Sequence, residues 1–166
     1  MTIKVGDKLP EGTLSEYIEV EGNGCTVGPN QFKVEDITKG KKVVIFGLPG
    51  AFTPTCSAKH VPSYLANFDK LKAKGVDDII CMSVNDPFVM GAWNVASGSK
   101  DITMLADGNG DFAEALGLTM DASKFGMGKR SQRYSAIIND GVVEKLNVEA
   151  PGEYSASSAE TMLGQL

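Results

Sequence analysis

The sequence has little of what marks a secreted or metal-binding protein. Its 166 residues contain three cysteines, Cys25, Cys56 and Cys81, and a single histidine, His60. The cysteines form neither an even set nor a CxxC pair, so a secreted disulfide framework is not expected. One histidine and three scattered cysteines also do not have a zinc-ligand spacing. We therefore expect free thiols in a reducing compartment and no bound metal.

Long apolar segments and clustered positive charge are also missing. The longest nearly apolar stretch, residues 43–52, is too short to cross a bilayer, and the first residues have no apolar core like that of a signal peptide. The net charge is -5 and the lysines are scattered, so no positive field is available to attract phosphate backbones. We expect a cytoplasmic protein with no membrane partner and no nucleic-acid partner.

The residues that are present are typical of one globular domain. Hydrophobic residues make up 42% of the chain, which is enough to build a single core and argues against disorder. Short periodic segments predict strands over residues 13–20, 31–37, 42–48, 77–86, 102–107, 133–139 and 142–149. The first two predict an N-terminal β-hairpin, and most of the others alternate with helical patterns. The expected fold is α/β, a single thioredoxin-like domain over residues 1–166 with a central mixed β-sheet flanked by helices.

Capping residues and apolar spacing locate the main helices. Residues 55–75 have apolar side chains at three-residue steps and predict a helix that Pro62 bends. Asp86, which precedes a proline, predicts the N-cap of the next helix. Ser157 with Glu160 forms a capping box that predicts the start of the last helix.

The stretch PGAFTPTCS, residues 49–57, presents a cysteine where a buried strand ends and a helix begins. In the first turn Cys56 faces unpaired backbone N–H groups and the positive end of the helix dipole, and both favour the nucleophilic thiolate. Thr53 can turn its hydroxyl toward the sulfur or toward an oxygen bound beside it. Pro49 and Pro54 stiffen the loop. A small buried hydrophobe is the commonest role of a cysteine, but this placement favours a reactive thiol.

The pattern Pro49-x-x-x-Thr53-x-x-Cys56 resembles the active-site motif of the peroxiredoxins. The segments GAFTPTCS and KHVP, followed by ICMSVNDPFVM, are similar to the type II, or peroxiredoxin-5-like, branch. The resemblance covers nearly the whole chain and implies a thiol-dependent peroxidase that reduces hydrogen peroxide and small organic hydroperoxides. In that family the cysteine becomes sulfenic acid and a thiol then restores it, with no metal or organic cofactor.

The resemblance implies a role for each matched residue. Cys56 would be the peroxidatic cysteine, Thr53 a hydrogen-bonding hydroxyl and Pro49 a shield, while the backbone N–H groups of Thr55 and Cys56 would bind the peroxide. The family also needs an arginine beside the sulfur, immediately before a strand aromatic, and Arg133 is in that position. A guanidinium suits this role because it stays charged and has several donors in a fixed fork.

Four other residues are open to more than one interpretation. Cys81 resembles the resolving cysteine of the plant type II branch, and the alternative is a packed core residue of a buried strand; Cys25 is a weaker candidate for the resolving role. No cysteine follows Cys81, so the C-terminal resolving cysteine of the animal type V pattern is missing. His60 would either add positive charge near Cys56 or pack on the helix face, and the second role is favoured. Arg130 is expected to be an exposed charge.

The expected partners are a hydroperoxide substrate, thioredoxin or glutaredoxin with glutathione as reductant, and a second copy of the chain in a homodimer. Phe88, Val89 and Trp93 would line the dimer face or pack in the core. Members of the resembled family occur in several organelles, so the compartment stays open. Two other functions would use the same thiol. One is a non-enzymatic redox sensor or relay, and the other is a thioredoxin-like disulfide oxidoreductase, which normally needs a CxxC or CxxS site.

Overall fold

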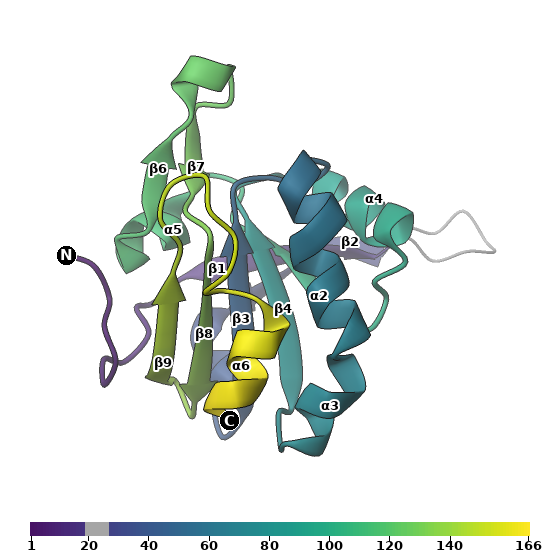
Figure 1. Cartoon of the computed structure of the whole chain (residues 1–166). Helices are drawn as coiled ribbons and strands as arrows, with labels where there is room; N and C mark the ends of the chain where they lie inside the picture. Colours follow the sequence, from purple (N-terminus) through teal and green to yellow (C-terminus); the bar gives the residue numbers. More distant parts are fainter. Residues whose placement is uncertain (19–26) are drawn as a thin grey trace.

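Seven strands of the described chain form one mixed sheet at the centre of the molecule (Figure 1). The structure is a computed structural model, and it describes residues 1–18 and 27–166. The strands are β1 (Thr13–Ile18), β2 (Val27–Lys33), β3 (Lys42–Leu48), β4 (Asp78–Ser83), β5 (Thr103–Ala106), β8 (Tyr134–Asn139) and β9 (Val142–Val148). Their order is β2-β1-β5-β4-β3-β8-β9, in which β3, β4 and β5 pair in parallel and the other pairs are antiparallel. A separate hairpin of β6 (Thr119–Asp121) and β7 (Lys129–Ser131) carries the short helix η2 (Ser123–Phe125) and projects beyond the sheet.

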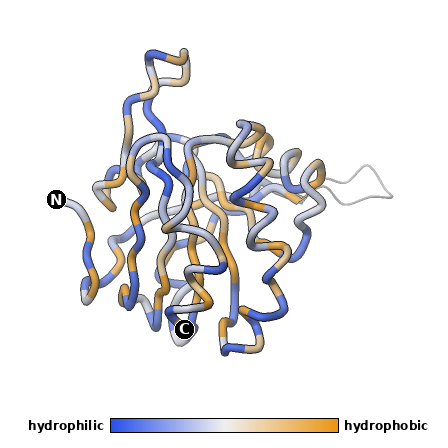
Figure 2. Tube along the Cα trace, in the orientation of Figure 1, coloured by the Kyte–Doolittle hydropathy of each residue, from blue (hydrophilic) through white to orange (hydrophobic). Residues whose placement is uncertain are grey.

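Helices cover both faces of this sheet. One face packs against α2 (Val61–Ala66), α3 (Phe68–Ala73), α4 (Pro87–Ser97) and α6 (Ala159–Gln165), and the other against α1 (Val34–Thr38) and α5 (Asp111–Leu116). Successive side chains of a strand point to opposite faces, so Val44 and Phe46 join the first layer while Val43 and Ile45 join the second. Figure 2 shows the hydrophobic residues concentrated along these central strands. The predicted α/β sheet flanked by helices is confirmed. None of the helices in the described ranges is long and apolar enough to cross a bilayer.

The predicted N-terminal hairpin is present, but its second strand differs from the prediction over residues 31–37. β1 and β2 pair antiparallel, and β2 begins at Val27 and ends at Lys33. The next residues form helix α1, whose buried Val34 and Thr38 are four positions apart and so lie on one helix face. The connection over residues 19–26, which contains Cys25, lies outside the described residues.

The helix predicted over residues 55–75 is not one regular helix, because its turns are irregular before Pro62 and at Asn67. Before Pro62 comes a π-helical turn, η1 (Cys56–His60), in which the N–H of Val61 donates to the carbonyl of Cys56 five residues earlier. Pro62 directly follows this turn as the second residue of α2, and it has no N–H to donate to the preceding turn. The break comes at Asn67, whose φ of -109° and ψ of 9° separate α2 from α3.

The two predicted N-caps have different outcomes. The Asp86 carboxylate accepts a 2.9 Å hydrogen bond from a backbone N–H in the first turn of α4, so this prediction is confirmed. The cap of α6 is wrong by one residue, because Ser158 caps the helix by accepting from Thr161 N–H at 3.3 Å. The Ser157 hydroxyl instead donates to the Glu149 carboxylate at 2.7 Å. That carboxylate competes for Ser157, and it lies too far along the chain for a local pattern to reveal it.

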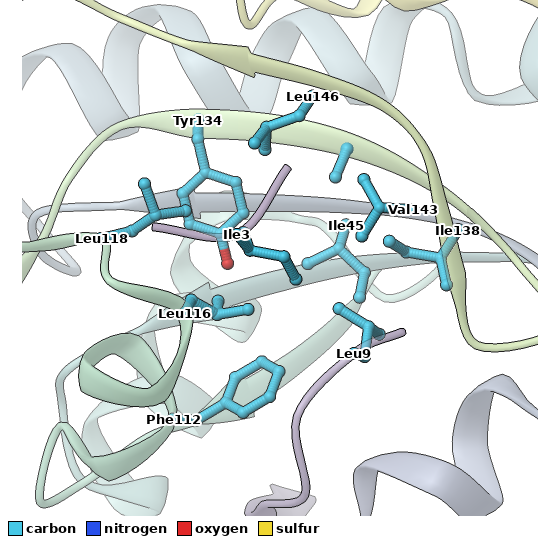
Figure 3. Close-up of a pocket in the computed structure, with 11 residues that line it drawn as sticks. Ile3, Leu9, Ile45, Phe112, Leu116, Leu118, Tyr134, Ile138, Val143 and Leu146 are labelled. Carbon is cyan, nitrogen blue, oxygen red and sulfur yellow. The ribbon is translucent and has the colours of Figure 1, made fainter. Parts of the chain in front are cut away.

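A small apolar cavity of about 10 Å³ lies between the N-terminal segment and the sheet (Figure 3). Among the described residues, the Tyr134 hydroxyl is the buried side-chain polar group with no hydrogen-bond partner. Figure 3 shows it among apolar side chains that include Ile3, Leu116 and Leu118. Burial raises the pKa of the Tyr134 hydroxyl. The tyrosine ring fills the space beside Gly47 in which a Cβ would stand, which explains a glycine inside β3.

Candidate active site

The loop after β3 is held by hydrogen bonds to the end of the neighbouring parallel strand. The side-chain oxygen of Asn85 accepts from Ala51 N–H at 2.9 Å and from the Ser83 hydroxyl at 2.7 Å. Phe52 has a φ of 63°, a left-handed conformation that is strained for a bulky residue and reverses the chain here. The loop containing Pro49 is therefore anchored and turned sharply before the helix begins.

The reversal at Phe52 brings Thr53 back onto the loop. The Thr53 hydroxyl donates to the carbonyl of Gly50 at 2.6 Å. Because this bond uses the single hydroxyl proton, the remaining lone pairs of the oxygen are available only as acceptors. Of the two orientations that the sequence allowed, toward the sulfur or toward a bound oxygen, this geometry suits an oxygen whose own proton can be donated to Thr53.

Helical residues begin at Pro54, and the first turn carries Thr55 and Cys56. The N–H of Ser57 donates to the Thr53 carbonyl at 2.9 Å, which makes Thr53 the N-cap position. The amides of Thr55 and Cys56 therefore fall among the first N–H groups of the helix, which have no intrahelical acceptor. The Cys56 residue is only 1% exposed, so its thiol lies beneath the loop rather than on the surface.

Arg133 reaches this thiol from the start of β8. Its Nη2 donates to Cys56 Sγ at 3.2 Å, although the two residues are 77 positions apart in the chain. Its Nη1 contacts Nδ1 of His60 at 2.9 Å. The guanidinium is half-buried and stands over the ring of Tyr154, with 5.9 Å between Cζ and the ring centroid. The structure thus brings together the cysteine and the arginine that the sequence motif selected.

His60 is fully buried, and its environment keeps it neutral. Burial and the Arg133 charge together lower the pKa of His60 to about 3. Its Nε2 is 3.1 Å from the carbonyl oxygen of Ser157, which can only accept. Nε2 therefore carries the proton, and Nδ1 accepts from Arg133. The histidine adds no positive charge near the thiol, and it does more than pack on the helix face.

The other arginine, Arg130, is not the exposed charge that was expected. It is half-buried, and its Nε and Nη1 donate to the carbonyls of Met127 at 2.9 Å and Val84 at 3.1 Å. A Cβ at Gly50 would lie 3.3 Å from its Nη1, so Arg130 also packs close to the active-site loop. Arg130 therefore links the β6–β7 hairpin to the end of β4, and its nitrogens point to backbone oxygens rather than to the cysteine.

Cys81 lies in β4 and is fully buried on the sheet face that Cys56 also contacts. Burial raises the pKa of the Cys81 thiol, and the nearby Cys56 adds to the effect while Arg133 opposes it. Both cysteines are free thiols. In this conformation Cys81 is a poor nucleophile and is covered by the helices above the sheet.

The aromatic residues of α4 divide between core and surface. Trp93 is 1% exposed, and its Nε1 donates to the Ser57 hydroxyl at 3.1 Å. Phe88 is 56% exposed and packs against the ring of Tyr17 with centroids 4.9 Å apart. Phe52 is similarly exposed, and its ring centroid lies 6.5 Å from that of Trp93.

A pocket of about 530 Å³ opens beside the cysteine. Its walls include Pro49, Thr55 and Arg133, and the β6–β7 hairpin adds the apolar Met120 and Phe125. Glu149 and the following loop to residue 153 close the remaining side. A molecule in this pocket would touch the loop, the first helical turn and the guanidinium together.

Comparisons with known proteins show the family to which this chain belongs. A family model described as Redoxin matches residues 4–163. The chain is 48% identical to Peroxiredoxin-2E-2, chloroplastic, of Oryza sativa subsp. japonica, over 99% of this chain and 73% of that protein. It is 45% identical to Peroxiredoxin-2B of Arabidopsis thaliana, over 99% of this chain and 98% of that protein. The chain belongs to the peroxiredoxins.

Solved structures also resemble this peroxiredoxin. Reduced Prx3 from Vibrio vulnificus in complex with H2O2 has 50% identity and a TM-score of 0.89, covering 99% of this chain and 96% of that one. Peroxiredoxin 5 from Alvinella pompejana has 35% identity and a TM-score of 0.83, covering 97% and 96%. These matches confirm the predicted thioredoxin-like fold and the resemblance to peroxiredoxins. The protein is therefore a thiol-dependent peroxidase, an oxidoreductase.

Sequence reasoning missed several residues around the site of this peroxiredoxin. Asn85 could have been noticed as a polar residue at the carboxyl end of a buried strand, where side chains of parallel strands gather. Glu149, Met120 and Phe125 gave no such signal, because the predicted elements said nothing about which loops meet beside the cysteine. Their positions depend on the long connections between β5 and β8 and between β9 and α6.

Proposed function

We propose that Cys56 is the residue of this peroxidase that attacks the peroxide. The observation that carries the proposal is the 3.2 Å contact between Arg133 Nη2 and Cys56 Sγ at the start of a helix. A guanidinium and the positive end of the helix both stabilise a thiolate relative to a thiol. Of the described cysteines, Cys81 has no comparable surroundings.

In the proposed reaction the Cys56 thiolate attacks the terminal peroxide oxygen. A sulfur–oxygen bond forms as the oxygen–oxygen bond breaks, and the second oxygen leaves as hydroxide or alkoxide and takes up a proton from solvent. The cysteine is oxidised to sulfenic acid by two electrons, and the peroxide is reduced by the same two. A thiol then attacks the sulfenic sulfur, releases water and forms a disulfide, which a second thiol reduces.

The remaining matched residues have roles in binding the peroxide. Thr53, whose proton is used by the Gly50 carbonyl, would accept a hydrogen bond from the attacked peroxide oxygen. The amides of Thr55 and Cys56, with Arg133, would donate to the oxygens as negative charge moves onto the leaving group. Pro49 lines the adjoining pocket and would shield the site from bulk water.

The proposed substrates are hydrogen peroxide and small organic hydroperoxides. The peroxide complex of the Vibrio vulnificus relative supports the first. The pocket supports the second, because Met120 and Phe125 provide apolar surface beside Arg133 for an organic substituent. Larger substrates would have to open the loop, since Cys56 is almost fully covered.

We further propose that Cys81 resolves the sulfenic acid by forming an intramolecular disulfide with Cys56. Both side chains pack into the same buried cluster on one sheet face. The helix that begins at Pro54 changes to a π-helical turn at Cys56, and this segment would unwind locally to bring the sulfurs together. Mass spectrometry after one equivalent of peroxide, with free thiols trapped, should find a Cys56–Cys81 crosslinked peptide. Sulfenic acid or glutathione adducts at Cys56 alone, with Cys81 still alkylatable after unfolding, would contradict this route.

Thioredoxin, or glutaredoxin with glutathione, is the proposed reductant, and a homodimer is the proposed assembly. Phe52 and Phe88 are both exposed and would form part of the contact between copies. Sedimentation of the reduced protein should give the mass of two chains, and Phe88→Glu should shift it toward one. A monomer at all concentrations would exclude this assembly.

The decisive test of the proposed function is peroxide loss in the presence of each reducing system. Wild type should turn over with at least one system, Cys56→Ser should be inactive, and Cys81→Ser should still react once with peroxide. A protein whose Cys56 is oxidised once but never recycled would be a redox sensor. Reduction of a test disulfide without peroxide loss would indicate a disulfide oxidoreductase.

A further inference from the structure

The loop between β9 and α6 is folded around one carboxylate, that of Glu149. This carboxylate accepts hydrogen bonds from the backbone N–H groups of Ser155 at 2.7 Å, Ala156 at 3.0 Å and Ser157 at 3.0 Å, and from the Ser157 hydroxyl at 2.7 Å. Burial opposes ionisation, but these hydrogen bonds prevail and lower the pKa of Glu149. Glu149 N–H also donates to the Arg133 carbonyl at 2.9 Å, so the loop begins beside the active-site arginine.

This loop directs the carbonyl of Ser157 into the core beneath the active site. Two buried donors meet there, His60 Nε2 at 3.1 Å and the Tyr64 hydroxyl at 2.8 Å. A carbonyl oxygen only accepts, so the histidine must carry its proton on Nε2 and leave Nδ1 as an acceptor. The opposite tautomer would place two acceptors against each other at Ser157 and two donors against each other at Arg133.

The guanidinium of Arg133 then bridges two fixed acceptors. Nη1 donates to Nδ1 of His60 at 2.9 Å while Nη2 donates to Cys56 Sγ at 3.2 Å. Because the guanidinium is planar, fixing the direction of Nη1 also fixes that of Nη2. An arginine side chain has many rotamers, and a single contact to sulfur would leave most of them open.

We infer that His60 is a positioning residue for peroxide reduction. The Ser157 carbonyl imposes one tautomer on the His60 ring, and in that tautomer Nδ1 holds the Arg133 guanidinium against Cys56. The inference rests on the proposed role of Cys56. His60 touches neither the sulfur nor the peroxide in this scheme and transfers no proton. Its function is to supply Nδ1 as a neutral acceptor in a fixed position. Glu149 contributes by holding the loop that carries the Ser157 carbonyl.

The tautomer can be tested without any variant, because His60 is the only histidine in the chain. Two-dimensional NMR of the 15N-labelled, reduced protein should show one neutral imidazole with the proton on Nε2 and an unprotonated, hydrogen-bonded Nδ1. Arg133→Ala should shift the Nδ1 resonance and leave Nε2 nearly unchanged. A proton on Nδ1, or a rapidly exchanging mixture of tautomers, would overturn the inference.

Two amide substitutions separate the two nitrogens of the ring. In His60→Asn the side-chain oxygen can take the place of Nδ1, whereas in His60→Gln the side-chain amide can take the place of Nε2 and the acceptor for Arg133 is lost. His60→Leu removes both. The second-order rate constant for peroxide should fall by about 10- to 100-fold in the glutamine and leucine variants, the scale for misplacing a catalytic group, and stay within about threefold of wild type in the asparagine variant.

Alkylation of Cys56 by iodoacetamide separates a loss of positioning from a general structural defect. A general defect would change the alkylation rate, whereas a loss of positioning would not. This reagent needs no guanidinium to bind its leaving group, so at a pH where the thiol is fully ionised its rate should change far less than the peroxide rate in every folded variant. Equal peroxide rates in wild type and His60→Leu, or equal losses in the asparagine and leucine variants, would overturn the inference. A wild-type protein that is alkylated at Cys56 but consumes no peroxide would overturn the proposed function instead.

Discussion

Acidification should destabilise the folded protein through His60. The buried ring has a pKa of about 3 in the folded state because of burial and the Arg133 charge, against an ordinary value of 6.5. Below pH 6.5 the unfolded chain therefore binds a proton that the folded chain does not. The neutral histidine makes its full contribution to the free energy of unfolding above pH 6.5. This contribution is lost as the pH falls from 6.5 toward 3.

The size of the effect follows from this difference in proton binding. The free energy of unfolding changes by at most about 1.4 kcal/mol per pH unit for one proton. Between pH 7.5 and pH 5 the loss due to His60 is therefore about 2 kcal/mol. At pH 5 the size of this loss depends mainly on the ordinary pKa of His60 in the unfolded chain, because His60 is still neutral in the folded protein at that pH. The lowered pKa of Glu149 adds to the loss on acidification, whereas the raised pKa values of Asp107 and Glu16 oppose it.

Urea unfolding of the reduced protein at pH 7.5 and pH 5 measures this loss, with His60→Asn as the matched control. The asparagine does not titrate, so carboxylate contributions cancel in the comparison between the two proteins. We expect the variant to be less stable at pH 7.5 and the gap to shrink by about 2 kcal/mol at pH 5. A gap that stays the same at both pH values would refute the reasoning, since it would mean that His60 binds protons equally in both states.

Substitutions at three other positions test the packing and the site. Tyr134→Phe removes a buried hydroxyl that has no partner and should raise the free energy of unfolding in urea by about 1 kcal/mol; a lower stability would contradict this. Thr53→Val should slow peroxide reduction by about 10- to 1,000-fold while Thr53→Ser stays active, and equal rates for valine and wild type would show that the hydroxyl has no part. Arg133→Lys should slow stopped-flow peroxide reduction by more than about tenfold, because an ammonium cannot replace a planar fork, and a wild-type rate would show that charge alone suffices.

Local patterns predicted most of the fold. The buried strands around Val44 and Ile80 were recognisable because a strand covered on both faces must be apolar at successive positions. The cap at Asp86 was recognisable because its acceptor and donor lie three residues apart. Where two local signals competed the prediction failed, as at Ser157 and Ser158, since the choice between them depends on Glu149.

In the active site, too, local features were predictable from the sequence and long-range contacts were not. The sequence by itself determined that a cysteine begins a helix after Pro49 and Thr53, because loop stiffness and helix polarity are properties of neighbouring residues. It also indicated an arginine, Arg133, through resemblance rather than physics. Only the tertiary structure decided how that arginine is held. The acceptor comes from His60 on a helix, and the carbonyl that orients this ring comes from a loop 97 residues further along the chain. A tautomer depends on which atoms face each nitrogen, and that is set by the packing of segments distant in sequence.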